Sequence, residues 1–113
     1  MKITFTVDFP ITPKGRPRKG KYGFYTPSRT ASCERAIRTI ASLSLRSQRR
    51  GKVFEGSVRV CLLLARCRGD LDNRAKLALD ALNGIAYKDD SQVKELHAIE
   101  VEGEISTITV EEL

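Results

Sequence analysis

The sequence predicts an α+β fold: a single domain over residues 1–113, with a mixed sheet of about four strands packed against two helices. Three observations lead to this prediction. Alternating apolar and polar residues, typical of strands, lie near both ends of the chain; two stretches between them carry apolar residues at helical spacing; and a long apolar run near the middle is typical of a central strand. A chain of 113 residues has room for one hydrophobic core.

The N-terminal part of the chain alternates and then changes character. Residues 2–8 place apolar side chains at every second position, so we predict the first strand there, ended by Pro10. Residues 13–28 are rich in Gly, Pro, Lys and Arg and are therefore predicted to form a loop. Its three aromatic side chains would either stack on an unpaired base or anchor the loop to the core; they are Tyr22, Phe24 and Tyr25.

The middle of the chain is predicted to hold a basic helix followed by the central strand. Over residues 30–48 an apolar stripe with helical spacing is formed by Ala36, Ile37, Ile40, Ala41 and Ser44. The basic residues off this stripe would face solvent or DNA. Residues 57–66 are apolar at both odd and even positions, so we expect this strand to be central and covered on both sides.

The C-terminal part is predicted to hold a second helix and two further strands. The helix spans residues 72–83, and its stripe toward the core is Ala75, Ala78, Leu79 and Leu82. Asp72 is placed to cap the N-terminus of this helix, and Gly84 to end it. Alternation returns at 95–102 and 105–111, where the Gly-Glu pair between them favours an antiparallel hairpin.

Charge is distributed unevenly along the chain, whose net charge is +6. Residues 11–52 are strongly basic with a single acid, whereas residues 69–113 are predominantly acidic. With this charge distribution, one side of the molecule would attract a polyanion. The simpler alternative is that the basic residues belong to a solvated loop and helix. The candidate DNA contacts are Lys14, Arg16, Arg18, Lys19, Lys21, Arg66 and Arg68.

Several classes of protein are excluded by composition. Cys33, Cys61 and Cys67 are odd in number, lack CxxC spacing and have one histidine to join them, which argues against a disulfide framework or zinc site. A reducing cytoplasm is therefore the expected compartment. No apolar run approaches the roughly 18 residues of a membrane span, so no membrane partner is expected.

Two carboxylates directly after the central strand are the first candidate for chemistry. Asp70 and Asp72 are two positions apart, so in an extended strand end they would point the same way. Their mutual repulsion would be relieved by a divalent cation, and Mg²⁺ prefers carboxylate, phosphate and water oxygens. Lys76 lies one helical turn after Asp72 and could orient it or hold a phosphate. The alternative is purely structural, with Asp72 as a cap and Asp70 in a surface turn.

A second acidic pair, Asp89 and Asp90, lies on the loop after the helix. The sequence alone does not bring this pair to Asp70. A calcium-loop pattern fails, because it needs a ligand at Arg74 and a glycine where the chain has alanine. Asp80 is four residues from Lys76, and an ion pair on the helix is the simplest interpretation of it.

The segment that contains these acids resembles the RusA family of Holliday junction resolvases. The resemblance rests on Arg68-Gly69-Asp70-Leu71-Asp72-Asn73, Lys76, Asp80-Ala81-Leu82-Asn83-Gly84 and Asp89-Asp90-Ser91-Gln92-Val93. It implies a small homodimeric endonuclease of phage or prophage origin that cuts four-way DNA junctions with Mg²⁺ or Mn²⁺. It also implies that Asp70, Asp72 and Asp90 are catalytic metal ligands and that Lys76 is needed. Asp89 would be a supporting or substitute ligand.

The sequence thus predicts a Mg²⁺-dependent, structure-selective DNA endonuclease that makes paired symmetric nicks in recombination and repair. No small-molecule cofactor is expected. A two-fold dimer would be the simplest way to make two symmetric nicks. Two alternatives remain open: a DNA-binding module without catalysis, and a nuclease of broader branched-DNA specificity.

Overall fold

The computed structural model describes residues 1–13, 18–20, 23–25 and 28–113. The main sheet is formed by β1 (Lys2–Val7), β4 (Val58–Ala65), β5 (Val93–Val101) and β6 (Ser106–Glu112). A separate two-stranded sheet is formed by β2 (Arg18–Gly20) and β3 (Gly23–Tyr25). The helices are α1 (Ser28–Arg49), α2 (Leu71–Leu82) and the single 3-10 turn η1 (Asp90–Gln92).

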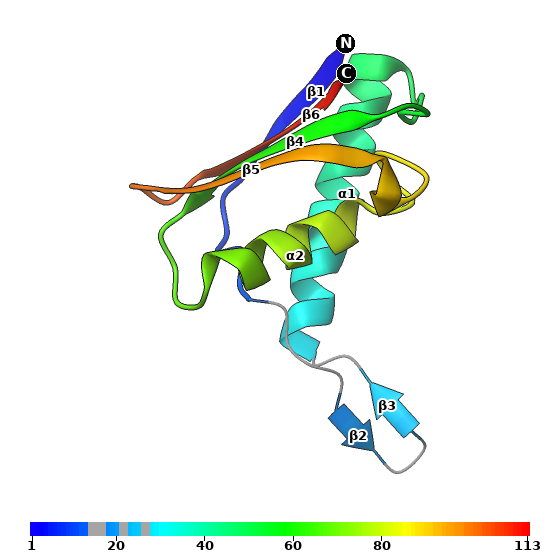
Figure 1. The fold of residues 1–113 in the computed structure, drawn as a ribbon. Coiled ribbons are helices and arrows are strands. Elements are labelled where there is room, and N and C mark those ends of the chain that lie inside the picture. The colour runs from blue at the N-terminus through cyan, green and yellow to red at the C-terminus, as the bar shows by residue number, and fades with distance from the viewer. Residues whose placement is uncertain (14–17, 21–22, 26–27) are drawn as a thin grey trace.

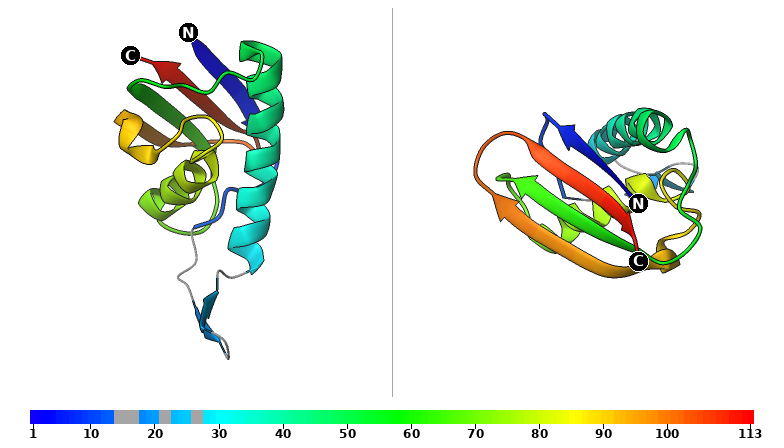
Figure 2. Two further views of the ribbon diagram at one scale, coloured as in Figure 1. Left: turned by 90° about the vertical axis from the view of Figure 1, so that its right-hand side faces the viewer. Right: turned by 90° about the horizontal axis from the view of Figure 1, so that it is seen from above.

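The main sheet is mixed, with strand order β1-β6-β4-β5. β4 pairs antiparallel with β6 and parallel with β5, while β1 pairs antiparallel with β6. Both long helices lie on the same side of this sheet, with α2 beside the β4–β5 half (Figures 1 and 2). The predicted architecture, a single domain with a four-stranded mixed sheet and two helices, is confirmed.

β4 is central as predicted, but among the described residues its two faces differ. Val58, Val60, Leu62 and Leu64 are fully buried beneath the helices, whereas Cys61 and Leu63 on the other face are only half-buried. The expectation of cover on both sides is therefore wrong for the described part of the chain. A strand can be apolar on both faces without two helical layers, because its paired neighbours shield part of the second face.

The connection from β4 through α2 to β5 is a parallel crossover, and it overturns the predicted hairpin of the last two strands. β5 and β6 follow each other in sequence, yet β4 lies between them in the sheet. The reason is that the most apolar strand gains most from neighbours on both edges, so β5 and β6 pair with β4 instead of with each other.

α1 packs along the molecule and contacts both α2 and β1. Its core-facing residues, spaced by four, are Cys33, Ile37, Ala41 and Leu45. The predicted stripe is therefore confirmed at Ile37 and Ala41, while Ala36, Ile40 and Ser44 are half-buried at its side. No helix in the described ranges is both long and apolar enough to cross a membrane.

The expectation of a loop over residues 13–28 is corrected by β2 and β3, which lie away from the main sheet beyond the N-terminal end of α1 (Figure 1). Arg18 pairs with Tyr25 and Gly20 with Gly23, so a short antiparallel ladder satisfies backbone groups that composition assigned to a loop. The candidate contacts Lys14, Arg16 and Lys21 lie outside the described residues, as does Tyr22.

Candidate active site

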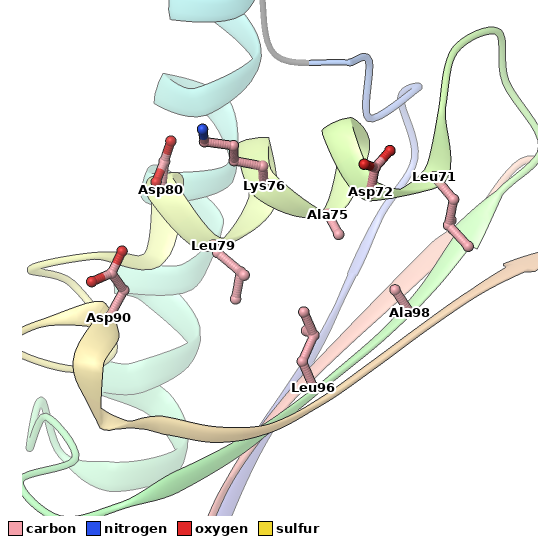
Figure 3. A pocket seen from close by; sticks show the side chains of 9 residues that line it. All are labelled: Leu71, Asp72, Ala75, Lys76, Leu79, Asp80, Asp90, Leu96 and Ala98. Carbon is pink, nitrogen blue, oxygen red and sulfur yellow. The ribbon is translucent and has the colours of Figure 1, made fainter.

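A cavity of about 480 Å³ opens between α2 and β5, next to the acidic segment singled out in the sequence. Figure 3 shows its rim and floor. The lining residues are Leu71, Asp72, Ala75, Lys76, Leu79, Asp80, Asp90, Leu96 and Ala98. α2 supplies one wall, β5 supplies Leu96 and Ala98, and η1 supplies Asp90. A crossover helix above the parallel strand pair is thus what creates this space.

The start of α2 differs from the prediction in one respect. The N-cap position is occupied by Asp70, whose extended backbone has φ −73° and ψ 138°, and whose carboxylate makes no capping hydrogen bond. Asp72 lies in the first helical turn, where its Oδ1 accepts a hydrogen bond from the Asn73 backbone N–H at 2.9 Å. Asp72 is therefore not the cap, and the pair does not lie on an extended strand end, because the helix begins one residue earlier than predicted.

Asp72, Lys76 and Asp80 follow one another at intervals of four along α2, so they share one face of the helix. Asp72 and Lys76 are exposed, and all three side chains line the cavity. Carboxylates in the first turn are favoured by the partial positive charge at the helix N-terminus.

Asp90 reaches the cavity from η1, which is held by a capping box. The Asp89 carboxylate accepts a hydrogen bond from the Ser91 backbone N–H at 3.0 Å. Hydrogen bonding from the Ser91 side chain, together with this backbone bond, lowers the pKa of Asp89. The Gln92 amide donates to the carbonyls of Phe54 and Gly56 at 2.8 and 2.9 Å. The turn that carries Asp90 is therefore tied to the segment before β4.

Tyr87 supports this turn from within the core. Its hydroxyl donates a hydrogen bond to the Leu79 carbonyl at 3.0 Å, which ties the segment just before η1 to α2. Burial raises the pKa of Tyr87, and the nearby negative charge of Asp90 raises it further. The tyrosine therefore stays neutral and acts as a hydrogen-bond donor to the backbone of α2.

Two residues outside the cavity position the start of α2. Gly69 has φ +105°, and a Cβ built there would lie 1.9 Å from Pro13 Cγ, so no larger residue fits without movement. Arg74 is fully buried; its Nε donates to the Ile11 carbonyl at 2.8 Å, and its guanidinium also binds the Ala65 carbonyl and Glu100. Arg74 thereby joins the segment after β1 to the end of β4.

A family model described as endodeoxyribonuclease RusA matches residues 8–111 of the chain. The chain belongs to the RusA family. Membership implies the nuclease activity of a Holliday junction resolvase acting on branched DNA. The resemblance noted over residues 68–93 is thereby confirmed and extends over nearly the whole chain. A search of curated proteins found no match.

In this RusA-family fold, the predicted site residues are only partly brought together. Asp72, Lys76 and Asp90 line one cavity, with Asp72 toward the N-terminal end of α2 and Asp90 near Leu79 and Asp80 (Figure 3). Asp70 is exposed at the N-cap, outside that lining. Across the described ranges, no three Asp, Glu, His or Cys side chains lie close enough to hold a metal ion.

The remaining predicted residues lie at the edge of this region. Arg66 and Arg68 are exposed on the segment between β4 and α2, next to Asp70. The backbones of Arg18 and Lys19 belong to β2. Asp89 is engaged in the capping box of η1.

Sequence reasoning missed the floor of the cavity and the buried arginine. Leu79 was assigned to the core but is half-buried at the cavity, and Leu96 is 45% exposed beside it. Helical spacing could have indicated Arg74, because it lies four residues before buried Ala78. The floor has no such signal, since it combines a helix and a strand from different parts of the chain.

Proposed function

We propose that this protein is a Mg²⁺-dependent, structure-selective DNA endonuclease that resolves four-way junctions by paired symmetric nicks, in DNA recombination and repair. The observation that carries the proposal is the convergence of Asp72, Lys76 and Asp90 on one cavity, with Asp70 at the adjoining helix start, in a chain of the RusA family. Phage or prophage origin and action in a bacterial cell belong to the same proposal.

The donor set fits a hard divalent cation. Asp70, Asp72 and Asp90 offer only carboxylate oxygens, which suit Mg²⁺, and Mn²⁺ could replace it. These three residues would hold one or two ions, after an adjustment that draws Asp70 and Asp90 toward Asp72. A bound ion would supply Lewis-acid activation for phosphodiester hydrolysis. Asp89 would support Asp90 by holding η1 in place, and would not itself be a primary ligand of the ion.

Lys76 has a separate task in this proposal. Its exposed ammonium lies on the same helix face as Asp72, four residues along. There it would contact the phosphate oxygens of the cleaved bond and offset the negative charge that develops on them. The Asp72 carboxylate would in turn orient the lysine.

Binding of the junction would rest on basic residues outside the cavity. Arg66 and Arg68 adjoin Asp70 and would contact phosphates next to the cut. Lys14, Arg16, Arg18, Lys19 and Lys21 would add contacts from the N-terminal segment. One cavity cuts one strand, so a homodimer would supply the second nick.

The test compares a labelled four-way junction with linear duplex of the same sequence, in Mg²⁺, Mn²⁺ and EDTA. We expect symmetric nicks in the junction only when a metal is present. Asp70→Asn should bind the junction as tightly as the unchanged protein but lose cutting by about a hundredfold or more. Glu104→Gln, an exposed acid on the loop before β6, is the control and should cut normally.

Three results would contradict the proposal. Cutting by Asp70→Asn in Mg²⁺ would contradict the assignment of Asp70 as a metal ligand. Tight junction binding by the unchanged protein without cutting in either metal would favour a non-catalytic binding module. Equal cutting of junctions, flaps and duplex would favour a nuclease of broader specificity.

A further inference from the structure

The floor of the cavity is apolar although its rim is charged. Leu71, Leu79 and Leu96, with two alanines, form the floor between α2 and β5 (Figure 3). Leu96 is 45% exposed, which is unusual for a leucine on the helix-covered side of the sheet. An exposed apolar surface in a concave site marks a place where a ligand buries it.

The chemistry of the floor decides which part of a DNA substrate can occupy it. The charged side chains of the cavity lie on its rim, whereas the leucines and alanines of the floor offer a phosphate no charged or polar partner. A nucleobase is uncharged and has apolar faces that aliphatic side chains can cover. The apolar floor is therefore complementary to the face of a base rather than to the sugar-phosphate backbone.

The floor lies next to the carboxylates, and this position identifies which base of the substrate would bind there. Asp72 and Asp90, proposed to act on the cut phosphate, border the same cavity. A base that flanks the cut phosphate is tethered to it through a single sugar. When the phosphate lies at the carboxylates, that base must lie on or beside the apolar floor.

We propose that the cavity between α2 and β5 binds one unstacked nucleobase flanking the cut phosphate; this inference rests on the proposed function. Leaving the stack is least costly for a base that is already poorly stacked, as at the branch point of a junction. The cavity would thus contribute to the selection of branched DNA, because a fully stacked duplex must first release a base to be cut.

The experiment places 2-aminopurine, which fluoresces when it leaves the stack, at either nucleotide flanking the mapped nick in a four-way junction. Binding is measured in EDTA, so that no strand is cut. None of the nine lining residues is aromatic, so the base is not quenched by them, and we expect a several-fold rise in fluorescence on binding. The same probe several nucleotides from the nick should show no rise.

Two variants change the cavity in opposite ways. Leu96→Ala removes floor surface, and Ala98→Leu fills the cavity; each should reduce the fluorescence rise and junction cutting several-fold. Ile99→Ala is the matched control, since Ile99 is 51% exposed on the other face of the same strand. It should keep both signals. Leu96 is exposed, so its replacement is expected to leave the melting temperature unchanged.

The outcomes separate this inference from the proposed function. If the junction is bound at saturation and cut in Mg²⁺, but neither flanking probe brightens, the base site is refuted and the carboxylate site stands. Unchanged fluorescence and cutting in both cavity variants would also refute the base site. Continued cutting by Asp70→Asn would instead refute the metal-ligand assignment on which the inference rests.

Discussion

Arg74 shows how one buried side chain sets the geometry around the cavity. Its guanidinium binds carbonyls at the ends of two segments, Ile11 and Ala65, and also Glu100 on β5. Arg74→Met would keep much of the packing but leave both buried carbonyls unpaired. We expect the free energy of unfolding, measured in urea, to fall by about 3 kcal/mol. Arg66→Met, at an exposed position, is the control and should change it little.

A stable Arg74→Met protein with full cutting activity would contradict that role. Loss of cutting in a variant that remains folded would instead indicate that Arg74 positions the start of α2. The two measurements therefore separate a contribution to stability from a contribution to site geometry.

Gly69 is the second residue whose identity is dictated by its surroundings. Both its φ of +105° and the close approach of Pro13 oppose any side chain. Gly69→Ala should lower the free energy of unfolding by about 1–3 kcal/mol or more and reduce cutting, because Asp70 follows directly. Gly103→Ala is the matched control: φ there is +104°, and its Cβ would meet nothing within 4 Å. Equal effects of the two changes would show that the contact with Pro13 is unimportant.

At the scale of elements, the sheet face turned away from the helices carries an ionic link across three strands. Arg59 on β4 donates to Glu95 on β5 at 2.5 Å and to Glu111 on β6 at 2.8 Å. The hydrogen bond from Arg59 lowers the pKa of Glu95. A lowered pKa in the folded state means that the link stabilises the fold above the ordinary pKa of 4.5 and is lost as the pH falls through the lowered value.

Glu95→Gln tests this link. We expect its melting temperature to be slightly below that of the unchanged protein at pH 7, and the gap to close as the pH falls below 4.5. The effect is small because both side chains are partly exposed and screened by solvent. A gap that persists unchanged at pH 3 would show that the loss comes from packing rather than from charge.

At the scale of the whole molecule, the proposed pair of symmetric nicks requires two copies of the cavity. If two copies act together, mixing unchanged protein with Asp70→Asn should give mixed dimers that nick one strand. On a supercoiled plasmid carrying a cruciform, we expect nicked circles to replace linear products as the inactive copy is added. The fraction of linear product should fall roughly as the square of the active fraction.

Sedimentation of the unchanged protein at assay concentration is the companion measurement. We expect a dimer. A fully active monomer, or linear product that falls only in proportion to the active fraction, would contradict the two-fold arrangement.

The sequence by itself determined the type of nearly every element and the family of the chain. Alternation at β1 and helical spacing along α1 and α2 predicted these elements to within about two residues, because local periodicity depends on which face of each element is buried. The short segment from Arg68 to Val93 was enough to indicate the RusA family, which the match over residues 8–111 confirms.

Only the tertiary structure decided which elements became neighbours. It placed β4 between β5 and β6, where local turn signals favoured a hairpin, because burying the most apolar strand outweighs the ease of a short connection. It also brought Leu79 and Leu96 together as the floor beneath Asp72 and Asp90. Contacts between residues distant in sequence leave no periodic signal, so the cavity could not be predicted from the chain alone.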